Sequence, residues 1–475
     1  MNTNNFYNPY RNRPKTVGLF FCAMLLLTIL SAFWSCDDFS DTTLPVSELN
    51  AGAVFEEKGT ANAAMTDIYA KIRENGLLTG KTNGISKEMG LYADELVWYG
   101  SNALASIHFY NNTLQPNNSN VSGWWNNAYS QIYAANAVIE GVTASTKLEQ
   151  SEGEHLKGEA LFVRSLLHFY LMQLYGEVPF IATTDYKQNT RVKRMPASEM
   201  TTQLINDLNT AAELLPDAYK TETRTRPNSY TVKALLARVY LYSGMWAEAA
   251  NSASAVLNNT ETYVWQTDLN AVFLKGSTTT IWQLMPRTAS RNTDEGGTFI
   301  FNAGPPPTTA LAPGLFAAFE SGDQRRIKWV RTISNASGTW YHAYKYKKSS
   351  TSNPPTEYPI VFRLAEQYLI RAEARAMQGE LIGAKEDLNK VRNTAGLGDS
   401  EAVTQIEIIT AIANERRVEL FTEYGHRFFD LKRAGKLDAV LLGTKPGWNS
   451  TDRLIPVSEQ ELGLNPNLLP QNPGY

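Results

Sequence analysis

One pattern of small and apolar residues occurs twice in this chain, 135 residues apart. In each copy a Gly separates two amphipathic stretches, as expected for two antiparallel helices joined by a tight turn. The matched positions are Ala237, Tyr240, Gly244, Trp246, Ala249, Ala253 and Val256 in the first copy and Ala372, Arg375, Gly379, Leu381, Ala384, Leu388 and Val391 in the second. Because one such unit cannot bury its own apolar face, we expect further helix pairs to stack beside these two, with 124–141 and 159–176 as partners.

Helical periodicity extends over most of the chain after residue 50. Apolar residues recur at three- and four-residue spacing in nine segments, and the two repeat copies follow the tetratricopeptide pattern. The segments are 55–75, 124–142, 155–175, 198–215 (with Ser198 as N-cap), 229–244, 246–257, 363–377, 382–392 and 403–421. We therefore predict an all-α, mainly helical fold in which tetratricopeptide-type helix pairs pack on a loop-rich region with short strands.

The loop-rich region is expected at about 259–359. Short β-prone pieces occur there at 280–285, 298–302, 328–333 and 339–346, separated by clusters of Gly, Pro, Ser and Thr. A hundred residues with little helix inside a helical protein are typical of a functional segment. We expect ligand contacts from this insertion.

The N-terminus has the pattern of a secretory signal that ends at a lipid-modified cysteine. Three basic residues precede an apolar run over 17–33, and Ser35 and Cys36 follow before two acidic residues. The apolar run is short for a spanning helix. We predict a signal peptide over 1–35, a lipid anchor at Cys36 and a single domain over 36–475. The alternative is an ordinary cleaved signal near Ser35 that leaves Cys36 as a free thiol.

Composition argues against several classes of function. Both cysteines, Cys22 and Cys36, lie in or beside the signal, so the folded part has no thiol for a disulfide, a metal or nucleophilic catalysis. The five histidines include no pair at metal-ligand spacing, and no Gly-x-Ser-x-Gly elbow occurs. A net charge of −3 leaves no basic footprint for nucleic acid. We predict no catalytic residue, no metal and no cofactor.

A dense charged and aromatic stretch covers 415–433. Glu415, Glu419 and Glu423 share one helix face at four-residue spacing, where like charges repel unless cations lie opposite. Arg427 and Arg433 are candidate partners. The stretch is either a ligand-binding cluster or an ion-pair lattice that fastens the last helices to the repeat, and we favour the lattice because such networks are often structural.

Five segments together resemble the SusD/RagB family of outer-membrane lipoproteins. They are 174–180, 363–374, 415–433, 454–456 and 465–475. The resemblance implies the helical SusD-like fold and a lipid-anchored protein at the bacterial cell surface, in the outer membrane of Bacteroidetes. It also implies a nutrient-uptake role: such a protein captures oligosaccharides, or less often peptides, as the lid of a TonB-dependent, SusC-like β-barrel transporter.

A binding protein without catalysis should hold sugars with aromatic ring faces and a few directional polar groups. Two aromatic stretches and one polar loop have this composition. The candidate ligand-binding residues are Trp98, Tyr99, Asn102, Arg291, Asn292, Trp340 and Tyr341. The alternative for the aromatic residues is core packing, and for the polar ones it is a solvent-facing loop.

Several functions remain open from the sequence. The favoured one is a surface glycan-binding lipoprotein that delivers oligosaccharides to its transporter and is not an enzyme. The alternatives are a peptide-capturing RagB-like protein, a secreted glycosidase built on helices, and a structural module whose repeat docks a partner protein.

Overall fold

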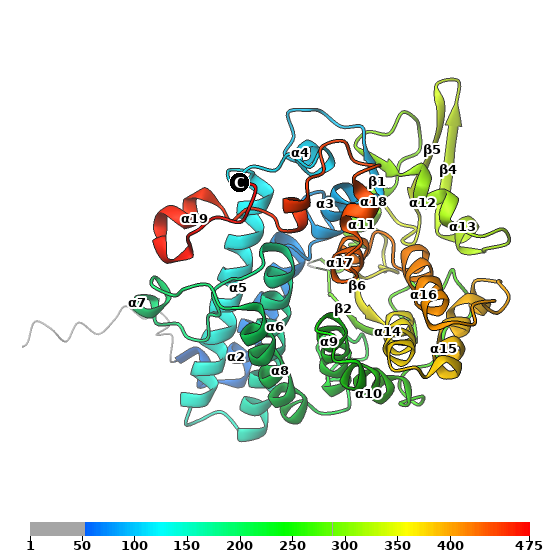
Figure 1. The fold of residues 1–475 in the computed structure, drawn as a ribbon. Coiled ribbons are helices and arrows are strands. Elements are labelled where there is room, and N and C mark those ends of the chain that lie inside the picture. Colours follow the sequence, from blue (N-terminus) through cyan, green and yellow to red (C-terminus); the bar gives the residue numbers. More distant parts are fainter. Residues whose placement is uncertain (1–52, 287) are drawn as a thin grey trace, which may run out of the picture. The chain divides into compact units, whose positions relative to one another are not determined.

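Helices in antiparallel rows dominate this computed structural model, which describes residues 53–286 and 288–475 (Figure 1). The predicted signal peptide and the predicted anchor Cys36 lie outside the described residues, as does the predicted domain boundary between 35 and 36. The described residues belong to one compact unit. Among the described helices, none combines the length and the apolar character needed to cross a membrane.

The helices are mostly where the periodicity predicts them. In chain order they are η2 (Ala53–Phe55), α2 (Lys58–Asn75), α3 (Ile85–Tyr92), α4 (Ser106–Tyr110), α5 (Ser119–Ala144), α6 (Gln150–Tyr175), α7 (Tyr186–Asn189), α8 (Ala197–Leu214), α9 (Ser229–Tyr242), α10 (Trp246–Leu257), α11 (Asp294–Phe299), α12 (Pro313–Ala318), α13 (Arg325–Lys328), α14 (Leu364–Met377), α15 (Leu381–Thr394), α16 (Gln405–Glu419), α17 (His426–Arg433), α18 (Leu437–Leu441), η3 (Ser450–Arg453), α19 (Glu459–Leu464) and η4 (Pro466–Leu468).

The two repeat copies are the helix pairs α9/α10 and α14/α15, which pack against each other through α10 and α14. Helix α5 packs on α6, α6 on α8 and α8 on α9, so the stack continues on one side. On the other side α16 packs on both α14 and α15 (Figure 1). The predicted stacking of further helices beside the repeat is thus confirmed. Helix α8 lies between the predicted partner α6 and the first copy.

Local sequence fixes where these helices begin and end. The side chain of Asn118 caps α5 by accepting hydrogen bonds from the backbone N–H groups of Asn120 (3.0 Å) and Val121 (3.3 Å). Helix α16 has a capping box between Thr404 and Glu407. The predicted cap Ser198 is wrong, because α8 begins one residue earlier, after Pro196, and has no side-chain cap.

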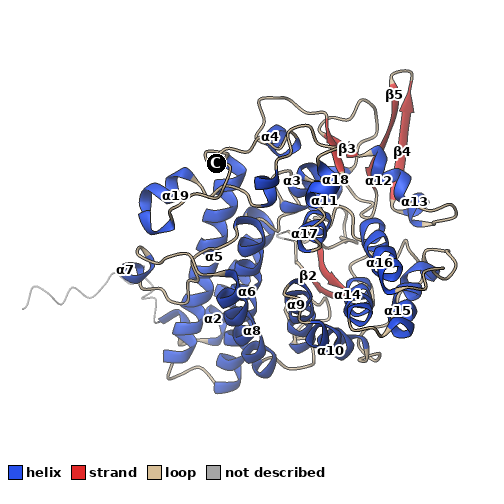
Figure 2. Ribbon diagram, in the orientation of Figure 1, coloured by secondary structure: helices blue, strands red, loops and turns tan. Residues whose placement is uncertain are grey.

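Short antiparallel strand pairs interrupt the helices (Figure 2). The strands are β1 (Leu96–Trp98), β2 (Thr280–Gln283), β3 (Thr309–Leu311), β4 (Val330–Asn335), β5 (Gly338–Ala343) and β6 (Ile360–Arg363). They pair as β1–β3, β2–β6 and β4–β5. The predicted strand at 298–302 is wrong: residues up to Phe299 belong to α11, which begins where the side chain of Thr293 accepts a hydrogen bond from Gly296 N (3.1 Å).

The acidic face of the 415–433 stretch is neutralised inside the protein. Arg325 lies between Glu415 and Glu419, at 2.7 Å from the Glu419 carboxylate, and Arg363 lies 2.8 Å from that of Glu423. All five side chains are at most 10% exposed. The ion-pair lattice is therefore confirmed, and it links α16 to α13 and to the junction of β6 with α14.

The predicted cations have other partners. Arg427 holds Asp94 through two hydrogen bonds of 2.7 and 2.9 Å, and Arg433 pairs with Glu373 on α14. Helix α17 is thereby fastened both to the segment before β1 and to the second repeat copy. Removal of one partner of such a pair leaves a buried charge uncompensated, which is strongly destabilising.

Candidate ligand-binding site

Strand β3 brings together the two aromatic stretches that the sequence separates by more than two hundred residues. Trp98 on β1 pairs with Thr309 on β3, and the next residue, Tyr99, donates a backbone hydrogen bond to Thr308 O (2.7 Å). On its other side β3 lies against β5. Figure 2 shows β3, β4 and β5 gathered at one side of the helices. The loops that leave these strands form the candidate ligand-binding site.

Trp98 lies in the hydrophobic core and is only 8% exposed. Its ring packs over Gly100, where a Cβ would lie 2.4 Å from a ring carbon, and the ammonium of Lys87 lies 4.8 Å from the ring centroid. This burial fits the core-packing interpretation and leaves little of the ring for a ligand. The predicted role of Trp98 as a stacking platform stays a prediction, and this burial argues against it.

Tyr99 and Asn102 lie at the surface just beyond β1. The side chain of Tyr99 is 41% exposed, and Asn102 is in the exposed segment 101–104 with Leu104. Successive residues of a strand point to opposite faces, which explains why Tyr99 is open while Trp98 is buried. An exposed ring beside an exposed amide is the combination that a sugar ring requires.

The second aromatic pair sits on the β4–β5 hairpin. Trp340 is 9% exposed and packs with Phe301 and Ala310 in a small cluster of its own. Its ring also covers Gly304 and Gly338, since a Cβ at either position would meet it. Trp340 therefore packs the hairpin onto the 301–310 segment and, like Trp98, offers little ring surface.

Tyr341 is half-buried and belongs to a three-layer stack. Its ring lies parallel to that of Phe316, with 3.6 Å between centroids and an interplanar angle of 13°. The guanidinium of Arg326 covers the other face of Phe316 at 4.2 Å. One face of Tyr341 is thus taken by protein, and the ring is held rigidly by α12. Phe316 and Arg326 were not among the predicted residues, because they lie in short helices without periodicity.

The polar loop candidates Arg291 and Asn292 are both engaged by neighbouring protein groups. Arg291 is half exposed and pairs with Asp294, which raises the pKa of Arg291. Asn292 is 1% exposed, and its amide is fully used: it donates to Ser350 O (2.9 Å) and accepts from Thr356 N (2.9 Å). Asn292 thus ties down the 350–357 loop, and the structure leaves it no free group for a ligand.

Charged groups next to Trp98 are buried and hydrogen-bonded to their neighbours, although the second carboxylate oxygen of Glu88 has no partner among the described residues. Lys87 Nζ donates to Ser106 Oγ (2.8 Å) and lies 3.3 Å from the Glu88 carboxylate, which also accepts from Asn120. Burial lowers the pKa of Lys87 and raises that of Glu88. Burial also raises the pKa of Glu95 to about 8, so this carboxyl is mostly protonated at neutral pH. Lys87 and Glu88 are therefore held in place next to Trp98 by hydrogen bonds.

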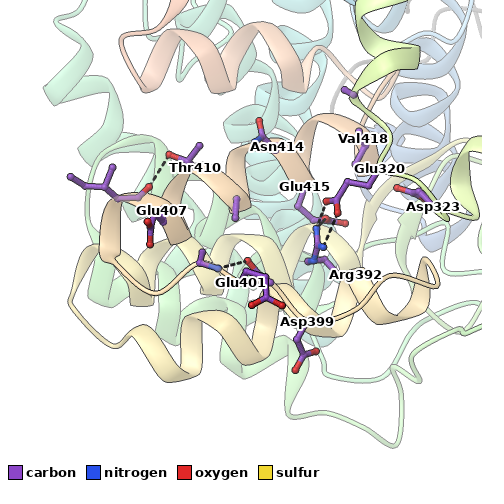
Figure 3. Close-up of a pocket in the computed structure, with 15 residues that line it drawn as sticks. Glu320, Asp323, Arg392, Asp399, Glu401, Glu407, Thr410, Asn414, Glu415 and Val418 are labelled. Carbon is purple, nitrogen blue, oxygen red and sulfur yellow. Dashed lines mark hydrogen bonds and ion pairs between the residues drawn. The ribbon is translucent and has the colours of Figure 1, made fainter.

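A hollow beside the second repeat copy is of a different kind (Figure 3). It has a volume of about 570 Å³ and is lined by α15, α16, the segment between them and the 318–323 segment at the end of α12. Carboxylates dominate its wall, and Arg392, which pairs with Glu320 (3.1 Å between Nη2 and Oε2), is its single cation. No aromatic ring lines it, so it has no platform for a sugar. Among the described residues, no group of three or more His, Cys, Asp or Glu side chains is arranged to hold a metal ion.

Comparison with known proteins points to one family. A family model described as "Starch-binding associating with outer membrane" matches residues 63–241, and one described as "SusD family" matches residues 329–475. SusD-like protein P2 from Formosa agariphila is 26% identical over 514 residues, which cover 95% of this chain and 98% of that protein. A SusD-like protein from Bacteroides ovatus is 32% identical over 130 residues, 27% of this chain and 23% of that protein.

Solved structures share the fold over most of the chain. A SusD superfamily protein from Bacteroides vulgatus has a TM-score of 0.77 at 22% identity and covers 88% of this chain and 99% of its own. A laminarin binding SusD-like protein has a TM-score of 0.75 at 24% identity, with the same coverage. Surface glycan-binding protein A from Bacteroides fluxus has a TM-score of 0.74 at 21% identity and covers 88% of this chain and all of its own.

Proposed function

Because this chain belongs to the SusD/RagB family, we propose that it is a surface glycan-binding protein that captures oligosaccharides without cleaving them. The observation that carries the proposal is the meeting of two aromatic stretches through β3, with Tyr99 and Asn102 left exposed. Aromatic rings and amides on a fixed scaffold recognise sugars with little ordering cost. The names of two structural neighbours, one laminarin binding and one surface glycan-binding, support this choice.

The proposal includes the membrane and the transporter. Acylation of Cys36 would tether the domain to the outer membrane at the cell surface, because each buried methylene of an acyl chain contributes about 0.8 kcal/mol. The captured oligosaccharide would pass to a SusC-like TonB-dependent barrel on which the protein sits as a lid. The family relationship and the sequence of the N-terminal segment support both steps.

Isothermal titration of the mature chain with laminari-, malto-, xylo- and manno-oligosaccharides tests the proposal. We expect at least one of these sugars to bind and Tyr99→Ala to weaken binding about tenfold, since an aromatic contact is worth about 1 kcal/mol beyond its buried area. Ile382→Ala is the control, because Ile382 is 80% exposed on the repeat helix α15. Binding of peptides in place of sugars would favour a RagB-like function, and release of shortened sugars would identify a glycosidase.

A further inference from the structure

Exposed apolar side chains gather in a groove remote from the loops described above. Tyr133 is 49% exposed, Tyr186 is 68% exposed and Leu464 is 69% exposed, and all three line one groove of about 500 Å³. Large exposed apolar surfaces are uncommon on soluble domains and mark binding sites when they are contiguous. The volume is within the range of about 300–1,000 Å³ that small-ligand sites occupy.

Three segments distant in sequence build the groove. Helix α5 contributes one wall, the 179–190 segment with α7 a second, and the C-terminal α19 with η4 a third. In Figure 1 these elements lie on the left of the domain, whereas the β4–β5 hairpin is at the upper right. The groove is therefore a separate site and no extension of the β1–β3 loops.

The floor of the groove is held in place by its own contacts. Trp125 is 3% exposed and packs edge-on against Tyr175, with 5.1 Å between ring centroids. Tyr129 lies 4.9 Å from Trp125, and its hydroxyl donates a hydrogen bond to Pro179 O (2.9 Å). Nearby, the amide of Asn136 donates to Ile181 O (3.0 Å) and fixes the second wall to α5. A ligand would meet preformed aromatic surfaces rather than order them.

The polar groups in the groove suit hydroxyls. Asn126 is exposed and has no side-chain hydrogen-bond partner among the described residues, while Asn189 donates to Thr183 O (2.8 Å) and keeps its carbonyl oxygen. Glu461 is the single carboxyl in the lining, and burial raises its pKa. Among the residues that the structure describes, no Lys or Arg lines the groove, which argues against sulfated or uronic sugars and against phosphate.

We propose that this groove is a second carbohydrate-binding site, which takes a neutral oligosaccharide between Tyr133 and Tyr186. Ring faces contact the C–H faces of the sugar, and the amides of Asn126 and Asn189 orient its hydroxyls. This site rests on the proposed function, because its ligand is also a sugar, but the residues that bind the sugar are different. A protein partner is less suited, because its interface would be flatter and larger than this concave hollow.

Isothermal titration with neutral hexasaccharides of the laminari, malto, xylo and manno series tests the site. In the wild-type chain we expect a stoichiometry above one sugar per chain. Tyr186→Ala should remove one class of binding, with at least a tenfold loss of affinity at that site, and Tyr186→Phe should retain it within about twofold because the ring is kept. Since Tyr186 lies at the surface, the melting temperature should not change in either variant.

The variant Tyr99→Ala distinguishes sugar binding in the groove from sugar binding at the β1–β3 loops. Sugar binding that survives Tyr99→Ala and is lost in the double variant Tyr133→Ala/Tyr186→Ala supports the groove, even if the β1–β3 loops bind nothing. Binding that is unchanged by the double variant overturns the groove and leaves the proposed site intact. Two further results would overturn the groove as a sugar site. One is that the wild-type chain gives no heat of binding with any of the sugars. The other is that the barrel transporter covers the groove and no sugar does.

Discussion

At the scale of single residues, Trp98 and Tyr99 show how one backbone position decides between core and surface. Both are large aromatic side chains at the end of β1, yet Trp98 is 8% exposed and Tyr99 is 41% exposed. Strand alternation turns the first ring onto Gly100 and Lys87 and the second toward the solvent. The two positions should therefore respond to truncation in opposite ways.

We predict that Trp98→Ala lowers the free energy of unfolding by about 3–5 kcal/mol, because it leaves a cavity in the core. Tyr99→Ala should change that free energy by less than about 0.5 kcal/mol while weakening glycan binding. Urea denaturation followed by circular dichroism measures the first quantity, and titration calorimetry the second. A stable Trp98→Ala protein with lost glycan affinity would show instead that the indole contacts sugar.

Two buried carboxyls give a second residue-scale prediction. Burial raises the pKa of Glu95 to about 8 and that of Glu295 to about 7, both above the ordinary value of 4.5. Between pH 4.5 and 8 the folded protein therefore retains protons that the unfolded chain has released. By linkage, these two groups make the unfolding free energy fall as pH rises through this window.

We expect the double variant Glu95→Gln/Glu295→Gln to lose much of this slope, since an amide does not titrate. One pKa unit corresponds to about 1.4 kcal/mol. Between the two ends of the pH window, the unfolding free energy of wild type should therefore fall by several kcal/mol more than that of the double variant. Urea titrations at pH 5, 6, 7 and 8 measure it, with the exposed Glu213→Gln as control. Parallel pH profiles for the double variant and wild type would show that both carboxyls are ionised in the folded protein.

At the scale of elements, the repeat depends on the backbone of its turn glycines. Gly244 has φ of +71° and Gly379 has φ of +83°, a region that side chains with a Cβ rarely adopt. No atom lies within 4 Å of the position that a Cβ on Gly379 would occupy, so a substitution there acts on the backbone alone. The turn is the only reason for glycine at this position.

Gly379→Ala should therefore destabilise the protein by about 1–2 kcal/mol. Gly379→Asn should cost less, because Asn tolerates the left-handed region. Thermal melts of the two variants beside wild type check the order. Equal stability of wild type and Gly379→Ala would mean that the turn relaxes to another conformation, and glycan affinity should be the same in all three proteins.

Helices and strands differ in how well the sequence predicted them. The long helices follow from periodicity because each buries a continuous stripe, as in α6 and α14. Strands β1 and β3 have only three residues each, and they exist because they pair with each other across more than two hundred residues. A single sequence carries no sign of that pairing. The strand predicted at 298–302 is wrong because its β-prone residues follow Thr293, whose side chain caps a helix.

The same reasoning applies to the candidate site. Composition identified the aromatic stretches around Trp98 and Trp340, but it did not show that both tryptophans would be covered by the neighbouring chain. Burial depends on what packs against a residue. Here the ring of Trp98 packs on Gly100 and that of Trp340 on Gly304, where a Cβ would collide with the ring. The groove around Tyr133 and Tyr186 has no motif, since its residues come from three distant segments.

At the scale of the whole molecule, binding and anchoring are separable tasks. The two proposed sugar-binding surfaces belong to residues 53–475, whereas the predicted anchor Cys36 precedes the described part of the chain. The proposed function needs both tasks, because a captured sugar is useful only if the protein stays at the surface. Changes at Cys36 should therefore affect location and leave affinity unchanged.

We predict that Cys36→Ala abolishes incorporation of labelled palmitate and releases the protein from the outer-membrane fraction, because the acyl chains supply the membrane affinity. The purified variant should bind oligosaccharides with wild-type affinity, and cells that carry it should grow poorly on the corresponding polysaccharide. Tyr99→Ala is the matched control, since it should remain at the membrane with weakened binding. Retention of Cys36→Ala at the cell surface with full growth would show that anchoring does not depend on this cysteine, and attachment would then have to come from the transporter itself.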